Sequence, residues 1–178
     1  MKKLLLISFL LTSTLFGYSY NDLLIKAQSS IFPKILLLDK KLDQKLVEGK
    51  VVYTIACEDN DYQTALQVQE LLNKHYQNRL GQYAFEVQVV PFSKLSAETK
   101  TTAVYALNSE DGIEKISRIA ETAGFMTFSY DIDNLKHGML LSLMVEKSTV
   151  LYLNKQGLQN HNVDFVDSLY QIVRFANN

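Results

Sequence analysis

The stretch that decides the fold covers residues 124–175 and reads GFMTFSYDIDNLKHGMLLSLMVEKSTVLYLNKQGLQNHNVDFVDSLYQIVRF. Three apolar runs in it have the length and side chains of strands: residues 125–130, 139–145 and 149–153. Only residues 146–148 separate the last two runs, and so short a link predicts an antiparallel hairpin. Asn154 and a polar loop follow, and apolar side chains at helical spacing then predict a closing helix over residues 163–175. Its buried face is predicted to hold Phe165 or Val166, Leu169, Ile172 and Val173.

The chain before this stretch alternates between strand and helix patterns. Strands are predicted at residues 51–56, 85–90 and 102–107, and helices over residues 62–79 and from Ser109 onwards. Gly81 is interpreted as the stop of the first of these helices. This alternation is typical of a mostly parallel sheet covered by helices. We therefore expect an α/β fold: a Rossmann-like sandwich of about five to six strands with helices on both faces and the antiparallel hairpin at the C-terminal end.

The N-terminal part contains a helix whose end the pattern does not fix. Residues 19–22 resemble a capping box that opens the helix. Pro33 ends or kinks it. Residues 35–38 are either a short buried strand or the continuation of a kinked helix, and periodicity does not decide between the two.

Residues 1–19 have the pattern of a secretory signal peptide. Two lysines precede an apolar run over residues 4–16, and Gly17 and Ser19 supply small side chains at a cleavage site before Tyr20. An uncleaved N-terminal anchor is the alternative, although the run is short for a membrane span of about 20 residues. Export of a chain with a single cysteine, which cannot form an internal disulfide, indicates a bacterial periplasm.

Composition is that of an ordinary globular domain, with 47% hydrophobic and 21% charged residues. The length suits one core, so we expect residues 20–178 to form a single domain. Removal of residues 1–19 takes two lysines away and changes the formal net charge from −1 to −3. This balance argues against nucleic acid as a partner, because phosphate binding needs a basic face.

Polar side chains stand directly after several of the predicted strands. Glu58 and Asp59 follow the first core strand, Ser109 follows the third and Asp131 follows the fourth. Ligands of open α/β sheets lie outside the carboxyl ends of the strands, so these side chains are candidates for binding a cation or a polar small molecule. The alternative is helix capping, because carboxylates and hydroxyls before a helix satisfy its first N–H groups.

The remaining reactive side chains carry no recognisable signature. Cys57 is either a nucleophile or redox sensor, or a small buried hydrophobe. The three histidines, His75, His137 and His161, occur singly, so no metal site is predicted. The chain contains no nucleophile elbow, dinucleotide fingerprint or P-loop, so no cofactor is predicted.

The C-terminal pattern resembles the YfiR-like family of bacterial periplasmic proteins. Phe-Ser-Tyr at residues 128–130, an acidic loop, Gly138-Met139 opening an apolar strand, a turn, a strand ending in Asn154 and a terminal helix carry the resemblance. The aromatic residue before Pro33 also lies where that family has an aromatic-Pro motif. The resemblance implies a Rossmann-type sandwich without catalytic residues, in which Gly138 and Asn154 serve backbone geometry and a turn or cap at the final helix.

The resemblance also implies a function. The family's best-known member restrains a membrane-bound diguanylate cyclase by binding its periplasmic part. It carries disulfides, whereas this chain has only Cys57, so a redox switch is not expected here. The leading hypothesis is a non-enzymatic periplasmic regulator that binds the periplasmic domain of an inner-membrane diguanylate cyclase or sensor kinase and so acts in cyclic-di-GMP or related signalling, alone or as a homodimer.

Two other functions remain open at this stage. The first is a periplasmic small-molecule binding module that feeds a sensor kinase or a transporter, with Asp59, Ser109 and Asp131 around the ligand. The second is a hydrolase whose paired carboxylates cannot be identified without their geometry.

Overall fold

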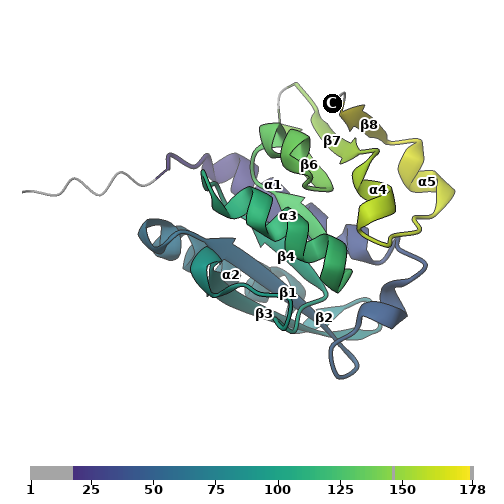
Figure 1. The fold of residues 1–178 in the computed structure, drawn as a ribbon, viewed down its shortest axis with the longest axis horizontal. Helices are drawn as coiled ribbons and strands as arrows, with labels where there is room; N and C mark the ends of the chain where they lie inside the picture. Colours follow the sequence, from purple (N-terminus) through teal and green to yellow (C-terminus); the bar gives the residue numbers. More distant parts are fainter. Residues whose placement is uncertain (1–17, 146, 177–178) are drawn as a thin grey trace, which may run out of the picture.

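The computed structural model describes residues 18–145 and 147–176, so residues 1–17 of the predicted signal peptide lie outside the described residues. Its centre is a single eight-stranded sheet with the order β2-β3-β1-β4-β5-β6-β7-β8 (Figure 1). The strands are β1 (Lys50–Cys57), β2 (Arg79–Leu80), β3 (Tyr83–Pro91), β4 (Ala103–Ala106), β5 (Met126–Ser129), β6 (Leu141–Val145), β7 (Thr149–Asn154) and β8 (Val173–Ala176).

Five α-helices and four short 3₁₀ turns connect and cover these strands. The helices are α1 (Asp22–Leu36), α2 (Tyr62–Tyr76), α3 (Gly112–Ala123), α4 (Gly157–Asn160) and α5 (Asp167–Tyr170). The 3₁₀ turns are η1 (Leu42–Lys45), η2 (Asp59–Asp61), η3 (Phe92–Lys94) and η4 (Ile132–His137). None of the helices among the described residues is both long and apolar enough to cross a membrane.

Strand pairing is parallel throughout except for β2 with β3 and β6 with β7. The predicted fold class is therefore confirmed: a mostly parallel α/β sheet with a C-terminal antiparallel hairpin. β1 lies near the middle of the sheet, and all of its residues after Lys50 are buried. A strand covered on both faces needs the nearly continuous apolar run that its sequence provides.

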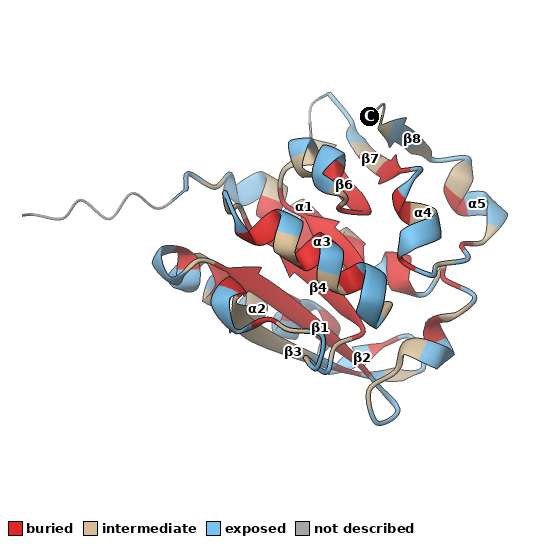
Figure 2. Ribbon diagram, viewed as in Figure 1, coloured by how far each residue is buried: buried red, intermediate tan, exposed pale blue. Residues whose placement is uncertain are grey.

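Helices cover both faces of the sheet, as Figure 2 shows by its buried centre. On one face, α1 and α2 bury Phe32 and Val68 against Tyr53, Tyr105 and Phe128 of the sheet. The Phe32 ring stacks on the Phe128 ring with centroids 4.8 Å apart. On the other face, α3 packs its buried residues against the alternate positions of β1 and β4: Ile113, Ile116 and Ala120 against Ala56, Val104 and Ala106. Alternate side chains of each strand thus enter opposite cores.

The predicted closing helix over residues 163–175 is wrong. The chain forms only the single-turn helix α5 and then the edge strand β8, which adds to β7 in parallel with Leu151 opposite Val173. Val173 and Phe175 also fit the period of a strand, and pairing with β7 satisfies backbone groups that would otherwise lie at the sheet edge. As a consequence Ile172, predicted to be buried, is 68% exposed.

The end of α2 also differs from the prediction. The helix stops at Tyr76, and Gln77 takes the left-handed conformation that ends it. Arg79 and Leu80 then form β2, a strand that the sequence pattern did not indicate, and Gly81 lies in the tight turn before β3 at φ +60°. Gly81 is therefore a hairpin residue and not the helix stop.

The first helix begins and ends differently from the capping-box interpretation. Asn21 is the N-cap, and its Oδ1 accepts a hydrogen bond from the Leu24 N–H at 3.0 Å. The helix runs through Pro33 and ends at Leu36, so residues 35–38 are helical continuation followed by a turn. The Leu38 carbonyl accepts a hydrogen bond from the Val166 N–H, which brings the end of α1 to the C-terminal segment.

Candidate functional site

The first candidate site lies between the carboxyl ends of β1 and β4. β3 lies on one side of β1 and β4 lies on the other, so the chain reverses its direction across the sheet at this point. Ligands of open α/β sheets bind at such a point. A cavity of about 450 Å³ opens here, and we call it the acidic crevice. It is lined by Tyr18, Glu58, Asp59, Asn60, Asp61, Glu110 and Asp111.

The structure brings three of the four predicted site residues together. Glu58 and Asp59 line the acidic crevice, and the Ser109 hydroxyl donates a hydrogen bond to Glu58. Ser109 Oγ also accepts a hydrogen bond of 2.8 Å from the Gly112 N–H at the start of α3. Asp131 lies apart from this cavity, and its carboxylate accepts a hydrogen bond of 2.9 Å from the Asp133 N–H in η4. Ser109 and Asp131 therefore both cap the turns that follow them.

Tyr20 bonds Asp61, one of the residues that line this crevice. Its hydroxyl donates to Asp61 Oδ2 at 2.7 Å and accepts from the Asn108 N–H at 3.2 Å. Its ring lies edge-on to Tyr130 at 4.8 Å, and the Tyr130 hydroxyl accepts from the Asn21 N–H at 2.8 Å. Burial, and next the hydrogen bond to Asp61, raise the pKa of Tyr20, so the phenol keeps its proton. No local pattern in the sequence marks Tyr20 for this position.

Cys57 lies beneath the same edge of the sheet and is fully buried. Burial, together with the neighbouring carboxylates led by Asp61, raises the pKa of the Cys57 thiol to about 12. A thiol with so high a pKa is not a thiolate at neutral pH, which favours the interpretation of Cys57 as a small buried hydrophobe. Within residues 18–145 and 147–176, no cluster of three or more histidine, cysteine or acidic side chains could hold a metal ion.

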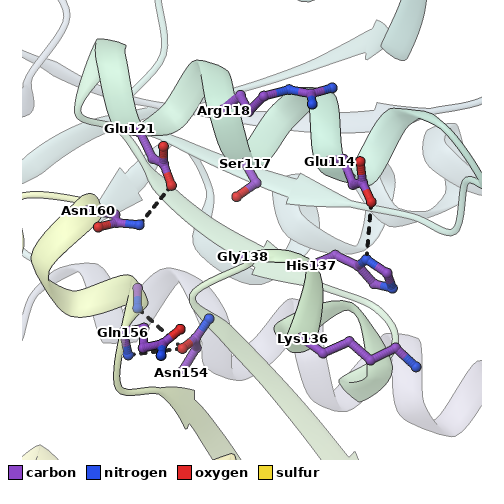
Figure 3. A pocket seen from close by; sticks show the side chains of 11 residues that line it. Glu114, Ser117, Arg118, Glu121, Lys136, His137, Gly138, Asn154, Gln156 and Asn160 are labelled. Atoms are coloured by element: carbon purple, nitrogen blue, oxygen red, sulfur yellow. Dashed lines mark hydrogen bonds and ion pairs between the residues drawn. The ribbon is translucent and has the colours of Figure 1, made fainter. Parts of the chain in front are cut away.

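A second cavity, of about 370 Å³, lies between α3, the end of η4 and α4 (Figure 3). We call it the polar pocket. Three segments line it: one face of α3, the turn that ends η4, and the β7–α4 connection with α4. The lining residues are Glu114, Ser117, Arg118 and Glu121 of α3, Lys136, His137 and Gly138 at the end of η4, and Asn154, Gln156, Gly157 and Asn160. The four α3 residues repeat at the spacing of one helix face, but the other two segments reach the pocket only through the tertiary fold.

Two polar pairs span the polar pocket between different elements. Asn160 Nδ2 donates to Glu121 Oε1 at 2.7 Å, which ties α4 to α3. His137 Nδ1 lies 3.4 Å from Glu114 Oε1, which ties the η4 turn to the same helix.

Asn154 and Gly138 build the floor of the polar pocket. The Asn154 amide donates to the carbonyls of Leu135 and Met139 at 2.9 and 3.2 Å, and its Oδ1 accepts from the backbone N–H groups that begin α4. Gly138 has φ +93°, and a Cβ there would collide with Ser117 Oγ. Glycine is thus required by both backbone conformation and close approach.

A third cavity, also of about 370 Å³, opens on the opposite face of the sheet, between α1, the β6–β7 hairpin and α5. We call it the apolar groove. It is lined by Ile31, Lys34, Ile35, Leu38, Leu143, Thr149, Leu151, Leu169 and Ile172, and Lys34 is the one charged side chain among these. The predicted closing helix places Ile172 on a buried face, so the sequence pattern does not indicate this groove.

His161 is a buried histidine next to the polar pocket. Its Nδ1 lies 3.2 Å from the Phe125 carbonyl and its Nε2 lies 3.1 Å from the Gly138 carbonyl. Burial lowers the pKa of His161 more than these carbonyls raise it. The unfolded chain therefore binds this proton more readily than the folded one, and stability falls as the pH drops below the unfolded value near 6.5.

We expect acidification from pH 7.5 to 5.5 to lower the free energy of unfolding, with a slope of up to about 1.4 kcal/mol per pH unit from this one group. Urea unfolding at several pH values measures the slope. Replacement His161→Gln is expected to flatten it, and parallel pH profiles of the two proteins would contradict the assignment.

Comparison with known proteins supports the fold of this chain but does not identify a family. No protein-family model and no curated protein matches the chain. Among solved structures, a conserved domain protein from Vibrio cholerae O1 biovar eltor is similar with a TM-score of 0.59 and 12% identity over 86% of this chain. The ABC domain in complex with L-Trp from Streptococcus pneumonia is similar with a TM-score of 0.53 and 12% identity over 80% of this chain.

The chain spans about 60% of the length of each of these two proteins. At 12% identity the likeness supports the Rossmann-like α/β fold alone.

Proposed function

We propose that this chain is a non-enzymatic regulator that is exported to the periplasm, binds the periplasmic domain of an inner-membrane diguanylate cyclase or sensor kinase, and holds that protein in one state. Such regulation requires a docking surface whose affinity differs between two conformations of the partner. It requires no catalytic residue and no cofactor.

The apolar groove is the observation that carries this proposal. Its lining is formed mainly by isoleucine and leucine side chains, and Ile172 at its rim is 68% exposed. Contiguous apolar surface of this kind is a common mark of protein–protein contact, because its burial removes it from water.

The charge of the groove indicates the chemistry of the partner segment. Lys34 is the one charged side chain among the described residues that line it. An apolar segment with a carboxylate beside it would fill the groove and place its negative charge next to Lys34. We therefore assign the groove to an apolar, acid-flanked segment of the sensor's periplasmic domain.

Replacing Ile172 with glutamate is expected to abolish capture of the sensor. The change puts a charge on the rim of the groove, opposite the acidic partner segment, without touching the core. The mature protein from Tyr20 is used as bait on solubilised inner membranes, and captured proteins are identified by mass spectrometry. Wild-type bait should recover a membrane protein with a periplasmic domain and a cyclase or kinase domain, and Ile172→Glu should recover at least about tenfold less.

Leu23→Glu is the matched control, because Leu23 is 63% exposed on α1 and lies outside the groove lining. This variant should capture the sensor as well as wild type does. Equal capture by Ile172→Glu would move the docking surface elsewhere. Failure of folded wild-type protein to capture any such sensor would remove the regulatory proposal.

A small-molecule binding module is the second candidate. One neighbour in fold was solved in complex with L-Trp, and the acidic crevice lies where α/β sheets bind ligands. Two observations argue against a ligand site around Asp59, Ser109 and Asp131: Tyr20 already bonds Asp61 in the crevice, and the Asp131 carboxylate bonds its own loop. We therefore rank contact regulation first.

A further inference from the structure

Ser117 presents a hydroxyl to the polar pocket from a residue that is otherwise buried. Ser117 is 5% exposed. Its side chain makes no hydrogen bond with any residue in the described ranges 18–145 and 147–176, and Figure 3 shows its oxygen directed into the pocket. The Ser117 oxygen is not among the fully buried polar atoms without a partner, which in the described residues belong to Ser29, Tyr53 and Asn108. It is therefore open to the pocket and free to bond a ligand or water.

Charged side chains of both signs line the same pocket, and they come from separate positions. On one side the Glu121 carboxylate is held by Asn160 at 2.7 Å. On the other side Arg118, next to Ser117 on α3, has no ion pair or side-chain hydrogen bond to another described residue. Lys136 adds a second cation, whose contact with Asp133 is long at 3.8 Å and exposed.

This distribution of charge selects one class of small molecule. A simple anion such as phosphate would meet the carboxylates of Glu114 and Glu121, and a simple amine would meet Arg118 and Lys136. A zwitterion satisfies both sets, because its ammonium can bond Glu121 while its carboxylate bonds the Ser117 hydroxyl and the Arg118 guanidinium.

We propose that the polar pocket binds a free α-amino acid with a small polar side chain. The volume of about 370 Å³ lies in the range of small-molecule sites. The polar lining favours a hydrophilic side chain over an aromatic one, because few apolar surfaces are present to bury a ring. Gly138 preserves the space in front of Ser117, since any side chain there would fill it.

The test is binding of free L-serine, L-glutamine and L-glutamate to the mature chain, measured by thermal shift and calorimetry. At ten times its dissociation constant, a bound amino acid should raise the melting temperature by about 3–6 °C. N-acetyl-L-serine lacks the ammonium and L-serinamide lacks the carboxylate, so both are expected to bind more weakly than L-serine by about 10- to 100-fold.

Two variants locate the site. Glu121→Gln keeps an oxygen for Asn160 but removes the charge, and Arg118→Gln removes the guanidinium. Each is expected to weaken binding by about 10- to 100-fold. Glu86→Gln on β3 and Arg174→Gln on β8 remove the same charges from surface positions outside the pocket lining and should bind like wild type.

The proposal is overturned if none of the three amino acids binds, or if binding survives unchanged in both Glu121→Gln and Arg118→Gln. This site does not depend on docking at the apolar groove, because the two cavities lie on opposite faces of the sheet. Loss of amino-acid binding in the pocket variants, with sensor capture intact, would separate the two activities.

Discussion

Replacement of Gln28 with leucine is expected to lower the free energy of unfolding by about 3–4 kcal/mol. Gln28 is fully buried on α1. Its Nε2 donates to the carbonyls of Tyr130 and Leu143 at 2.9 and 3.2 Å, and its Oε1 accepts from the Tyr105 hydroxyl at 2.5 Å. Leucine has a similar volume but leaves all three groups without a partner in the core.

Urea unfolding of the matched pair Gln28→Leu and Gln69→Leu measures this effect. Gln69 lies half-buried on α2 and bonds the Val87 carbonyl at 2.9 Å, where water can replace it, so its loss should lower stability by less than about 1.5 kcal/mol. The double change Gln28→Leu with Tyr105→Phe should recover part of the loss, because it removes one stranded hydroxyl. Equal effects of the two leucine variants would refute the role given to the Gln28 network.

Replacement of Asp39 with alanine is expected to destabilise the protein by about 3–5 kcal/mol. The Asp39 carboxylate is fully buried, and its Oδ2 accepts from Lys45 Nζ at 2.6 Å. Its Oδ1 accepts from the N–H groups of Lys41 and Asp164, both at 3.0 Å. Burial lowers the pKa of Lys45, which the bond to Asp39 opposes. Alanine would leave this buried ammonium without its counter-charge.

Asp39 also joins parts of the chain that are distant in sequence. It forms an isolated bridge with Phe165, which connects the end of α1 to the segment before α5. The double change Asp39→Ala with Lys45→Met removes both charges and should be more stable than Asp39→Ala alone. Denaturant unfolding of the two variants decides the point, and equal stability of the two would mean that the pair itself contributes little.

Much of the fold could be predicted because it follows from the local spacing of apolar residues. Residues 51–57 are apolar except for Thr54, and α3 places Ile113, Ile116 and Ala120 at helical spacing. These periods identify a strand buried on both faces and a helix buried on one, and their alternation predicts the parallel sheet. The chain could therefore be placed in the α/β class before its contacts were known.

The candidate sites could be predicted only where capping signals coincide with strand ends. Glu58, Asp59 and Ser109 come together because parallel strands present their carboxyl ends at one edge. Asp131 follows the same rule in sequence, yet its carboxylate turns to the backbone of its own loop. The Asp131 carboxylate accepts a hydrogen bond from a backbone N–H two residues away, and the spacing of apolar residues does not indicate this contact.

The sequence by itself determined the class of the fold and most of the residues that α2 and α3 bury, because these depend on short-range periodicity. The helical face predicted for the first helix was wrong, since α1 buries Ile25, Gln28 and Phe32 and leaves Leu23 exposed. Tertiary structure alone decided that residues 173–176 form a strand, since the required hydrogen-bond partners belong to β7. It also decided that Tyr20 bonds Asp61 at the acidic crevice, and that α3, η4 and α4 meet at the polar pocket. Each of these contacts joins segments far apart in the chain, and no local pattern encodes which distant surface a segment will meet.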